Sequence, residues 1–405
     1  MNTILSIAIL VTLCTSLVLV FWFRNLKLRG SDPLPLTAFM AILFTSGLDV
    51  GLIMFPLTEF PVYETEAAYS FTNPLAIEFG FWGFLVWGFY FLTTFYFCVI
   101  EPKLKLFEIG WVKLINSAVI IATCAFTGFL FLSYLPSYIE GISDPFRYGL
   151  VAAVVLAAVL SSTDIRYVKW LGLGSSVLFF CLIALLCLTS CACVSELARS
   201  ASNISGYFAN LPKFTSPLTD YHAFYLFWWF AWSIMIGQFV ARFVGGLRTY
   251  QLMIALLVLP SIPIALWFSV LYIYHTQAIE LAGALQLSMV IVGVIFVINS
   301  LDSLTRLYSE NLGLTVTRLG GVGYVAAHWG LLFGLILLYQ FTPLKIEWIG
   351  LVVIGIYCAI YALTFIRRDA LRGAAEPEMT SHGLDIRLHY CRRRLGGLRP
   401  RQSPV

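Results

Sequence analysis

Charged residues are scarce in this chain. Asp, Glu, Lys and Arg make up 11% of the 405 residues, whereas 60% are hydrophobic and the mean hydropathy is +0.87. A soluble domain cannot bury so much apolar surface, so a soluble fold is excluded. The net charge of +4 is too small to indicate a nucleic-acid partner. Alternating segments of about ten residues are missing, which excludes an outer-membrane barrel.

Signatures of catalytic and metal sites are also missing. No nucleophile elbow is present, and the histidines show no metal-ligand spacing. The nine cysteines are scattered, and their only close pair, Cys191 and Cys193, fits neither a zinc site nor a disulfide framework. We therefore expect structural cysteines, no enzyme activity, no metal and no organic cofactor. The five histidines are His222, His275, His328, His382 and His389.

Apolar runs of about 20 residues recur along the whole chain, and each is long enough to cross a bilayer as a helix. They predict an all-α polytopic membrane protein with about eleven transmembrane helices, because a helix satisfies its own backbone in lipid. The predicted spans are residues 3–23, 35–57, 77–100, 112–134, 146–162, 172–192, 221–244, 250–274, 282–305, 322–341 and 344–366.

Basic residues concentrate in alternate connections between these spans. The positive-inside rule makes those connections cytoplasmic, which places the N-terminus outside and the C-terminus inside. The opposite connections 58–73 and 195–220 are the longest, and GYFANLP in the second predicts a short surface helix. The basic connections carry Arg24/Lys27/Arg29, Lys103/Lys105, Arg166/Lys169, Arg242/Arg248, Arg306/Arg318 and Arg367/Arg368.

The Arg-rich segment 367–405 has two interpretations: contact with the anionic cytoplasmic leaflet, or a topogenic signal that only keeps the tail inside.

The segment LFTSGLDVGLIMFPLTE is unusual for a membrane helix. Gly47 and Gly51 weaken the helix, Pro56 removes a backbone donor, and Asp49 adds a carboxylate near mid-membrane. This combination favours an interrupted helix that exposes backbone groups to ions and substrates. The alternative is a packing pair of glycines, with Asp49 in a salt bridge to a neighbouring helix.

Two other apolar segments are rich in tryptophan. In Phe224–Gly237, Trp228 and Trp232 lie about 40° apart on a helix and Trp229 about 100° from Trp228. Alone, such residues are more often packing or interfacial side chains than ligands. A second cluster, in WGFLVWGFY, places Trp82, Trp87 and Tyr90 within about 140° of a continuous helix. Two aromatic clusters on separate helices predict a box for a quaternary ammonium.

The segment FVINSLDS places small polar side chains in an otherwise apolar helix. Asn299 and Ser300 follow Phe296 by three and four residues. Their oxygens can coordinate a hard cation, or they can hydrogen-bond to a neighbouring helix. The motif alone favours neither alternative.

Together, these motifs resemble the betaine/choline/carnitine transporter family (BCCT). WGFLVWGFY is similar to the family's WGxxxWxxY, FYLFWWFAW to FYWAWWISW, and ARFVGGLRT to ARISRGRT. LLVLPSIPIALWFSV resembles the helix that follows, GLDVGLIMFPLTE resembles GMGIGLMFFGVTE, and NSLDS resembles TSADS. The resemblance runs in unbroken order from about residue 26 to 366.

The resemblance implies a LeuT-type inverted-repeat core of two five-helix repeats in a bacterial inner membrane, and by analogy a homotrimer. It divides the chain into an extra N-terminal helix with its cytoplasmic connection (1–34), a transporter core (35–366) and a basic cytoplasmic tail (367–405). The family usually has twelve spans with both termini inside, so one N-terminal helix is expected to be missing here.

The resemblance also implies the site residues. The substrate box would be Trp82, Trp87, Tyr90, Trp228, Trp229 and Trp232, with Asp49 beside it, and the ion site would be Leu48, Asp49, Phe296, Asn299 and Ser300. Asp49 replaces the central glycine of the family's GxGxG motif, whereas choline carriers place an Asp where this chain has Gly51. Leu48 stands where Met is usual, and Asn299 where sodium-coupled members have Thr.

These observations predict a secondary transporter of a choline-, betaine- or carnitine-like solute, coupled to Na⁺ or H⁺. Asp49 favours a net-positive substrate over a zwitterion. A sensor that keeps the aromatic box but does not transport is the alternative, and an enzyme is not expected.

Overall fold

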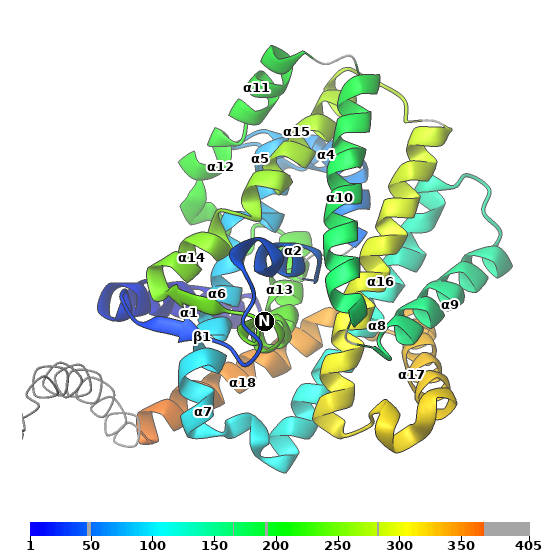
Figure 1. Ribbon diagram of the computed structural model, residues 1–405. Coiled ribbons are helices and arrows are strands. Elements are labelled where there is room, and N and C mark those ends of the chain that lie inside the picture. Colours follow the sequence, from blue (N-terminus) through cyan, green and yellow to red (C-terminus); the bar gives the residue numbers. More distant parts are fainter. Residues whose placement is uncertain (47–49, 165, 191–192, 282, 368–405) are drawn as a thin grey trace, which may run out of the picture.

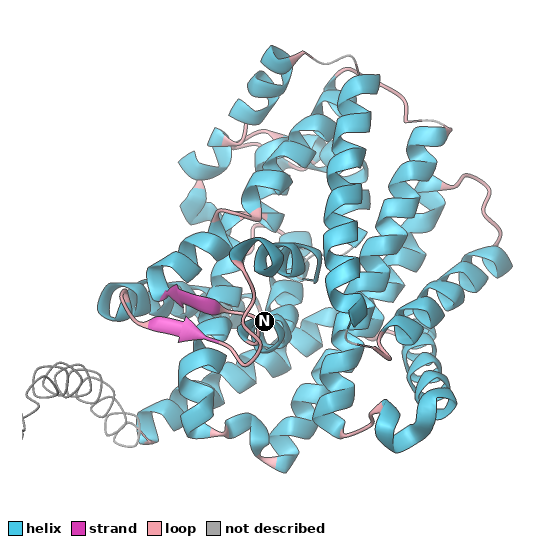
Figure 2. Cartoon of the chain, viewed as in Figure 1, coloured by secondary structure: helices cyan, strands magenta, loops and turns pink. Residues whose placement is uncertain are grey.

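The computed structural model describes residues 1–46, 50–164, 166–190, 193–281 and 283–367 (Figure 1). In these ranges the chain is almost entirely helical, with one short pair of strands (Figure 2). The strands are β1 (Lys27–Arg29) and β2 (Gly245–Arg248), and the short 3₁₀ or π segments are η1 (Ala67–Tyr69), η2 (Phe84–Val86), η3 (Tyr96–Ile100), η4 (Leu106–Glu108) and η5 (Leu211–Thr215). The α-helices are α1 (Asn2–Phe23), α2 (Leu36–Ser46), α3 (Val50–Met54), α4 (Pro56–Thr65), α5 (Pro74–Trp82), α6 (Trp87–Phe95), α7 (Glu101–Leu104), α8 (Gly110–Tyr138), α9 (Asp144–Ser161), α10 (Arg166–Thr189), α11 (Val194–Ser202), α12 (Ser205–Ala209), α13 (Asp220–Ala241), α14 (Thr249–Leu257), α15 (Ser261–Thr276), α16 (Ala284–Leu312), α17 (Val316–Phe341) and α18 (Ile346–Ile366).

The all-α polytopic fold is confirmed. In the described ranges, 10 helical segments are long and apolar enough to cross a membrane, and each matches one predicted span. The remaining prediction, 35–57, corresponds to α2 and α3. The interruption expected at Gly47–Gly51 falls largely on residues 47–49, which lie outside the described ranges.

The connections predicted to be cytoplasmic meet on one side of the bundle, called here the basic face. There β1, after α1, pairs antiparallel with β2, after α13. Arg242, which ends α13, pairs with Glu310 of α16 at 2.7 Å. Arg367, after α18, donates to the carbonyl oxygen of Leu104 at 3.3 Å. These contacts agree with the predicted grouping of loops, and the compartment that this face meets stays a prediction.

The connections on the opposite face also contact one another. The hydroxyl groups of Tyr69 and Thr219 lie 2.6 Å apart, and the Asn73 amide donates to the carbonyl oxygen of Asn203 at 2.9 Å. The short helix predicted in GYFANLP is present as α12. Much of the predicted connection 58–73 is helical as well, because α4 continues to Thr65 and η1 follows it.

Helix α13 is the interior element of the bundle (Figure 1), and nearly all of its side chains are buried. It packs against α6, α18 and α8, while α16 packs against α8 and α10. Helix α1 is different, because it buries only one face, formed by Leu5, Ile9, Thr12 and Ser16, against α6 and α14. The rest of α1 is apolar and exposed, as expected for a helix that contacts lipid.

Candidate functional site

The predicted aromatic site is built around a break between α5 and α6. Helix α5 ends at Gly83, whose extended backbone (φ −107°, ψ 166°) leaves the preceding carbonyl groups without helical partners. Two tryptophans satisfy them: the Trp87 indole N–H donates to the carbonyl oxygen of Trp82 at 3.0 Å, and the Trp229 N–H donates to that of Phe81 at 2.6 Å. The expectation of one continuous helix through Trp82, Trp87 and Tyr90 is therefore wrong.

The other side of the break is fixed by polar groups from distant elements. The backbone N–H of Phe84 donates to the hydroxyl of Ser261 at 2.8 Å, and that of Leu85 donates to the hydroxyl of Tyr207 at 3.2 Å. Phe84 has a left-handed backbone conformation (φ 46°), which is costly for a residue with a side chain. Strain of this kind persists only where the surroundings hold it, and these hydrogen bonds from α12 and α15 do so.

Three of the predicted tryptophans form one cluster. The Trp82 ring is nearly perpendicular to the rings of both Trp228 and Trp229, with centroids 5.5 Å apart and interplanar angles of 85° and 86°. The rings of Trp228 and Trp229 are nearly parallel, at 26° and 6.2 Å. Edge-to-face contact is the preferred geometry of aromatic rings, because the positive edge of one meets the negative face of the other. Trp82 therefore packs closely against both of the indoles that were predicted to bind a cation.

Among the described residues, two of the other predicted box residues contact this cluster directly or through a neighbouring ring, and one does not. Tyr90 contacts Trp229 at 5.8 Å and Trp87 at 5.2 Å. Trp232 is buried on α13 but makes no ring contact within the described part of the chain. The structure thus connects five of the six side chains. The indole nitrogens of Trp82, Trp228 and Trp232 are buried without a hydrogen-bond partner among the described residues.

Sequence reasoning missed the side chains that close this cluster. Phe55, between α3 and α4, contacts Trp82 at 6.1 Å and Trp228 at 6.2 Å, and its ring stacks on Tyr134 of α8 at 3.9 Å. Two buried carboxyl groups, Glu59 on α4 and Glu78 on α5, lie next to this layer. Glu59 is the last residue of the segment LFTSGLDVGLIMFPLTE. A carboxyl group at the end of a predicted membrane span was the sequence signal that could have identified it.

In this structure the aromatic rings fill their own box. A bound cation lies within about 6 Å of a ring centroid, over the ring face. The Trp82 ring already lies at a centroid distance of 5.5 Å from both Trp228 and Trp229. A quaternary ammonium that took the position of the Trp82 ring against these indoles would have to displace it.

The predicted ion site is only partly described. Phe296, Asn299 and Ser300 are fully buried on α16, which packs against α2 and α3. Neither amide atom of Asn299 has a hydrogen-bond partner among the described residues. Such a group is costly to bury unless something else binds it. The other predicted members, Leu48 and Asp49, lie outside the described residues.

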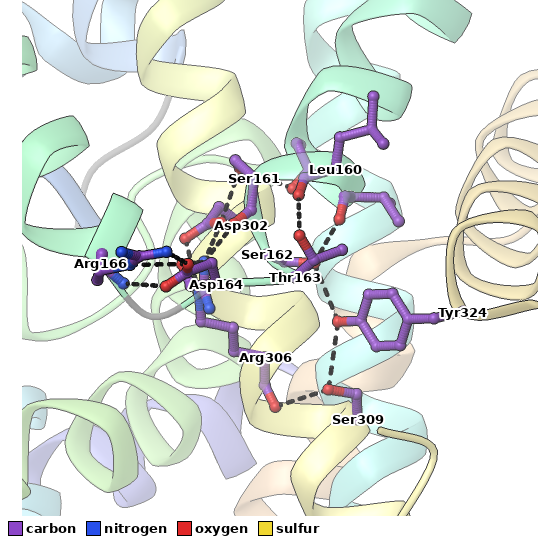
Figure 3. A network of polar contacts seen from close by, with 12 residues as sticks. Leu160, Ser161, Ser162, Thr163, Asp164, Arg166, Asp302, Arg306, Ser309 and Tyr324 are labelled. Carbon is purple, nitrogen blue, oxygen red and sulfur yellow. Dashed lines mark hydrogen bonds and ion pairs between the residues drawn. The ribbon is translucent and has the colours of Figure 1, made fainter. Parts of the chain in front are cut away.

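A polar network connects α16 to the α9–α10 connection on the basic face (Figure 3). Asp302 is fully buried and pairs with Arg306 one turn later, at 2.9 Å. The Arg306 guanidinium also donates to the carbonyl oxygens of Ser161 and Asp164, at 2.5 and 2.6 Å. The exposed Arg166 guanidinium hydrogen-bonds to the Asp164 carboxylate and lowers its pKa to about 2. Arg306 therefore fastens the end of α9 to α16.

A family model of the betaine/carnitine/choline transporters (BCCT) matches residues 111–278, which include Trp228, Trp229 and Trp232. Three curated relatives are each 24% identical. The glycine betaine transporter OpuD of Bacillus subtilis matches over 61% of this chain and 57% of its own length. A glycine betaine transporter of Acinetobacter baylyi matches over 62% and 45%, and glycine betaine transporter 1 of Vibrio parahaemolyticus over 65% and 58%. The chain spans about half the length of these curated relatives.

Among solved structures, a Na⁺-coupled sialic acid symporter in a substrate-bound, outward-open state aligns over 92% of this chain and 82% of its own. The TM-score is 0.37 and the identity 14%, and at these values the alignment carries no argument about this chain. The inverted-repeat core, and the position of α1 outside it, stay predictions.

Proposed function

We propose that this chain is a member of the betaine/carnitine/choline transporter family and a secondary transporter of a small methylated ammonium solute. The ammonium group of choline, betaine or carnitine would bind on the faces of Trp228 and Trp229. Transport would follow an alternating-access cycle in which the site opens to each side of the membrane in turn. The protein would need no metal or organic cofactor.

The observation that carries this proposal is the position of Trp82. The Trp82 ring packs at right angles against two indoles that are nearly parallel to each other, and Trp82 is the last residue of α5 before the break at Gly83. Each cation–π contact is worth about 0.5–2 kcal/mol. Two or three contacts would therefore supply about 1–6 kcal/mol, while a dissociation constant of 1 mM to 1 μM corresponds to about 4–8 kcal/mol. The cluster can thus provide a large share of the binding free energy of a small ammonium ion.

The closed cluster also supports a moving site rather than a rigid one. The Trp87 and Trp229 indoles are anchored by hydrogen bonds to the broken helix, whereas that of Trp82 is not. Rotation of Trp82 would expose the two ring faces without breaking either anchor. Opening of this closed cluster on one side of the membrane would then admit the solute.

The coupling ion belongs to the same proposal. The unpartnered amide of Asn299, next to Phe296 and Ser300 on α16, supports an ion site at this position, completed by Leu48 and Asp49. An amide oxygen is a suitable ligand for Na⁺, as are hydroxyl and backbone oxygens. Asp49 would add charge that favours a cationic substrate, so Asp49→Gly should weaken uptake of choline more than uptake of betaine.

Uptake into proteoliposomes tests the proposal. Purified protein would be supplied with labelled choline, betaine or carnitine, each with and without an imposed Na⁺ or H⁺ gradient. We expect accumulation of at least one solute and competition by the others. Accumulation of none of them would overturn the proposal. Binding of a solute without accumulation would instead indicate a sensor that retains the aromatic site.

A further inference from the structure

Two carboxyl groups are buried together beside the aromatic cluster. Glu59 on α4 is 2% exposed and Glu78 on the neighbouring helix α5 is 0% exposed. Neither forms an ion pair with a lysine, arginine or histidine in the described part of the chain. Two carboxylates buried without a cation are strongly unfavourable, because each loses its hydration and they repel each other. One proton on the pair removes most of this cost.

The hydrogen bonds around Glu59 fit an ionised group. Both of its oxygens accept hydrogen bonds from tyrosine hydroxyl groups on α4, α8 and α13, and its carboxyl group also lies against that of Glu78. Such donors favour the charged form of a carboxylate. The donors are Tyr63 at 2.5 Å, Tyr225 at 2.8 Å, Tyr134 at 3.3 Å and Tyr221.

The position of Glu78 then requires a proton. The Tyr63 hydroxyl lies 2.5 Å from a carboxyl oxygen of Glu59 and 2.8 Å from one of Glu78. A hydroxyl has one hydrogen and donates it once, so both contacts are hydrogen bonds only if one carboxyl group is protonated. With Tyr63 donating to Glu59, Glu78 donates its own proton to the Tyr63 oxygen. The chain Glu78–Tyr63–Glu59 therefore holds one proton and one negative charge.

Among the described residues, the other ionisable groups around the pair do not supply a cation. Of the imidazoles on adjoining elements, His222 accepts from the backbone N–H of Leu218 at 3.2 Å, and His275 pairs with Glu64 at 2.9 Å. The remaining neighbours are tyrosines: Tyr63 on α4, Tyr69 on η1, Tyr134 and Tyr138 on α8, and Tyr221 and Tyr225 on α13.

A second observation connects this pair to the candidate substrate site. The Glu78 oxygen Oε1 is buried with no hydrogen-bond partner among the described residues. One helical turn later on α5 is Trp82, whose indole N–H lies close to the Glu78 carboxyl group. Displacement of Trp82 by a bound cation would therefore change the surroundings of the group that carries the proton.

We propose that Glu59 and Glu78 form a proton-binding pair whose proton competes with a cation in the aromatic cluster. In the closed structure the pair holds one proton. When a cationic solute displaces Trp82, its positive charge stabilises both carboxylates, and the proton leaves Glu78 for water. That the pair holds one proton is a property of the protein alone, whereas the competition rests on the proposed function.

Infrared spectroscopy tests the pair without any transported solute. Carbonyl stretching of a neutral carboxylic acid would be followed in the purified full-length chain while the pH is varied. We expect a neutral-acid band near neutral pH that is lost in Glu78→Gln and kept in Glu66→Gln, which changes an exposed glutamate after α4. Tyr63→Phe, which removes the bridging hydroxyl, should shift the band if Glu78→Gln fails to fold. A wild-type spectrum without the band, or a band that is unchanged in Glu78→Gln and in Tyr63→Phe, would overturn the proposal that the pair holds a proton.

Ligand binding at several pH values tests the competition. Tryptophan fluorescence would report binding of choline and betaine to the wild-type chain, Glu78→Gln and Glu66→Gln. We expect the dissociation constant for choline to fall by up to about tenfold per pH unit where the pair titrates, and to become independent of pH in Glu78→Gln only. The change for betaine should be smaller, because its carboxylate offsets its positive charge. A dissociation constant for choline that does not depend on pH in the wild-type chain would contradict the competition. Binding of neither solute would contradict the proposed function, while the infrared result would remain valid.

Discussion

Replacing Arg306 with methionine tests how the basic face is held closed. In the structure, Arg306 is 6% exposed and Asp302 is 0% exposed. The Arg306 guanidinium bonds to both Asp302 oxygens, at 2.9 and 3.1 Å, and to the carbonyl oxygens of Ser161 and Asp164. Methionine keeps most of the apolar stem but none of these donors. Among the described residues, Asp302 then has at most one donor, the hydroxyl of Ser161 at 2.7 Å, which also lies 2.8 Å from the carbonyl oxygen of Ala158.

The expected cost follows from what remains buried. Removing one partner of a buried ion pair typically costs about 3–5 kcal/mol, because the other charge stays desolvated. The double variant Asp302→Leu/Arg306→Met contains no uncompensated charge, so we expect its free energy of unfolding to fall by only about 2 kcal/mol, for the two lost hydrogen bonds to the carbonyl oxygens of Ser161 and Asp164. The losses of unfolding free energy caused by Asp302→Leu alone and by Arg306→Met alone should therefore not add. The coupling free energy between the two substitutions should be about 3 kcal/mol or more.

Unfolding in mixed micelles, followed by tryptophan fluorescence, provides the measurement. The matched control is Arg166→Met, which removes a neighbouring arginine whose side chain is 84% exposed and pairs only with Asp164. An exposed pair contributes little, so the unfolding midpoint of this control should not change measurably. If Arg306→Met unfolds no earlier than the control, or if the double variant loses the sum of its two single variants, the buried pair is not what holds α9 to α16.

Three further predictions concern the aromatic and ion sites. Trp228→Leu should weaken binding of choline in a fluorescence titration by about 2- to 30-fold, the equivalent of one cation–π contact. The control Trp170→Leu, at a tryptophan on α10 that is 77% exposed, should leave choline binding unchanged. Equal effects of the two substitutions would contradict a role of the Trp228 ring. Trp87→Phe leaves the carbonyl group of Trp82 buried without a donor, so it should destabilise the protein by about 1–3 kcal/mol in micelle unfolding, and unchanged stability would refute that anchor. Asn299→Thr, which restores the residue of sodium-coupled family members, should steepen the Na⁺ dependence of uptake, and a loss of that dependence would contradict the ion site.

The membrane spans were predictable because an apolar run of about 20 residues rarely forms anything but a transmembrane helix. The prediction failed where polar and helix-breaking residues are buried by tertiary contacts. Residues 58–65 contain Pro61 and several polar side chains, which suggest a loop, yet they form α4. Pro56 stands in the first turn of that helix, where proline is favoured rather than disruptive. Glu59 is buried there because tyrosines from α8 and α13 surround it, and no local pattern shows this.

The tryptophans of the site were predictable as residue types, but their arrangement was not. Helical periodicity placed Trp82, Trp87 and Tyr90 on one arc, and that argument requires an unbroken helix. Gly83 ends α5, so Trp87 turns back to bond to the carbonyl oxygen of Trp82. The contact between Phe55 and Trp82 joins segments separated in sequence and depends on how α3, α5 and α13 pack. The strand pair β1–β2 was not predictable either, since strands of three and four residues carry too little pattern.

The two faces of the bundle are closed by different kinds of interaction, and this difference has a consequence for the proposed transport cycle. On the basic face, Arg306 and Asp302 form a buried ion pair, and Arg306 also binds the end of α9. On the opposite face, closure depends on rings around Phe55 and Trp82 and on hydroxyl groups around one carboxylate, Glu59. Separating the ion pair would leave two buried charges, whereas separating the tyrosines from Glu59 admits water to an anion that water solvates well. Opening on the side of Glu59 should therefore be the less costly step, and in the absence of solute the protein should favour states that are closed on the basic face.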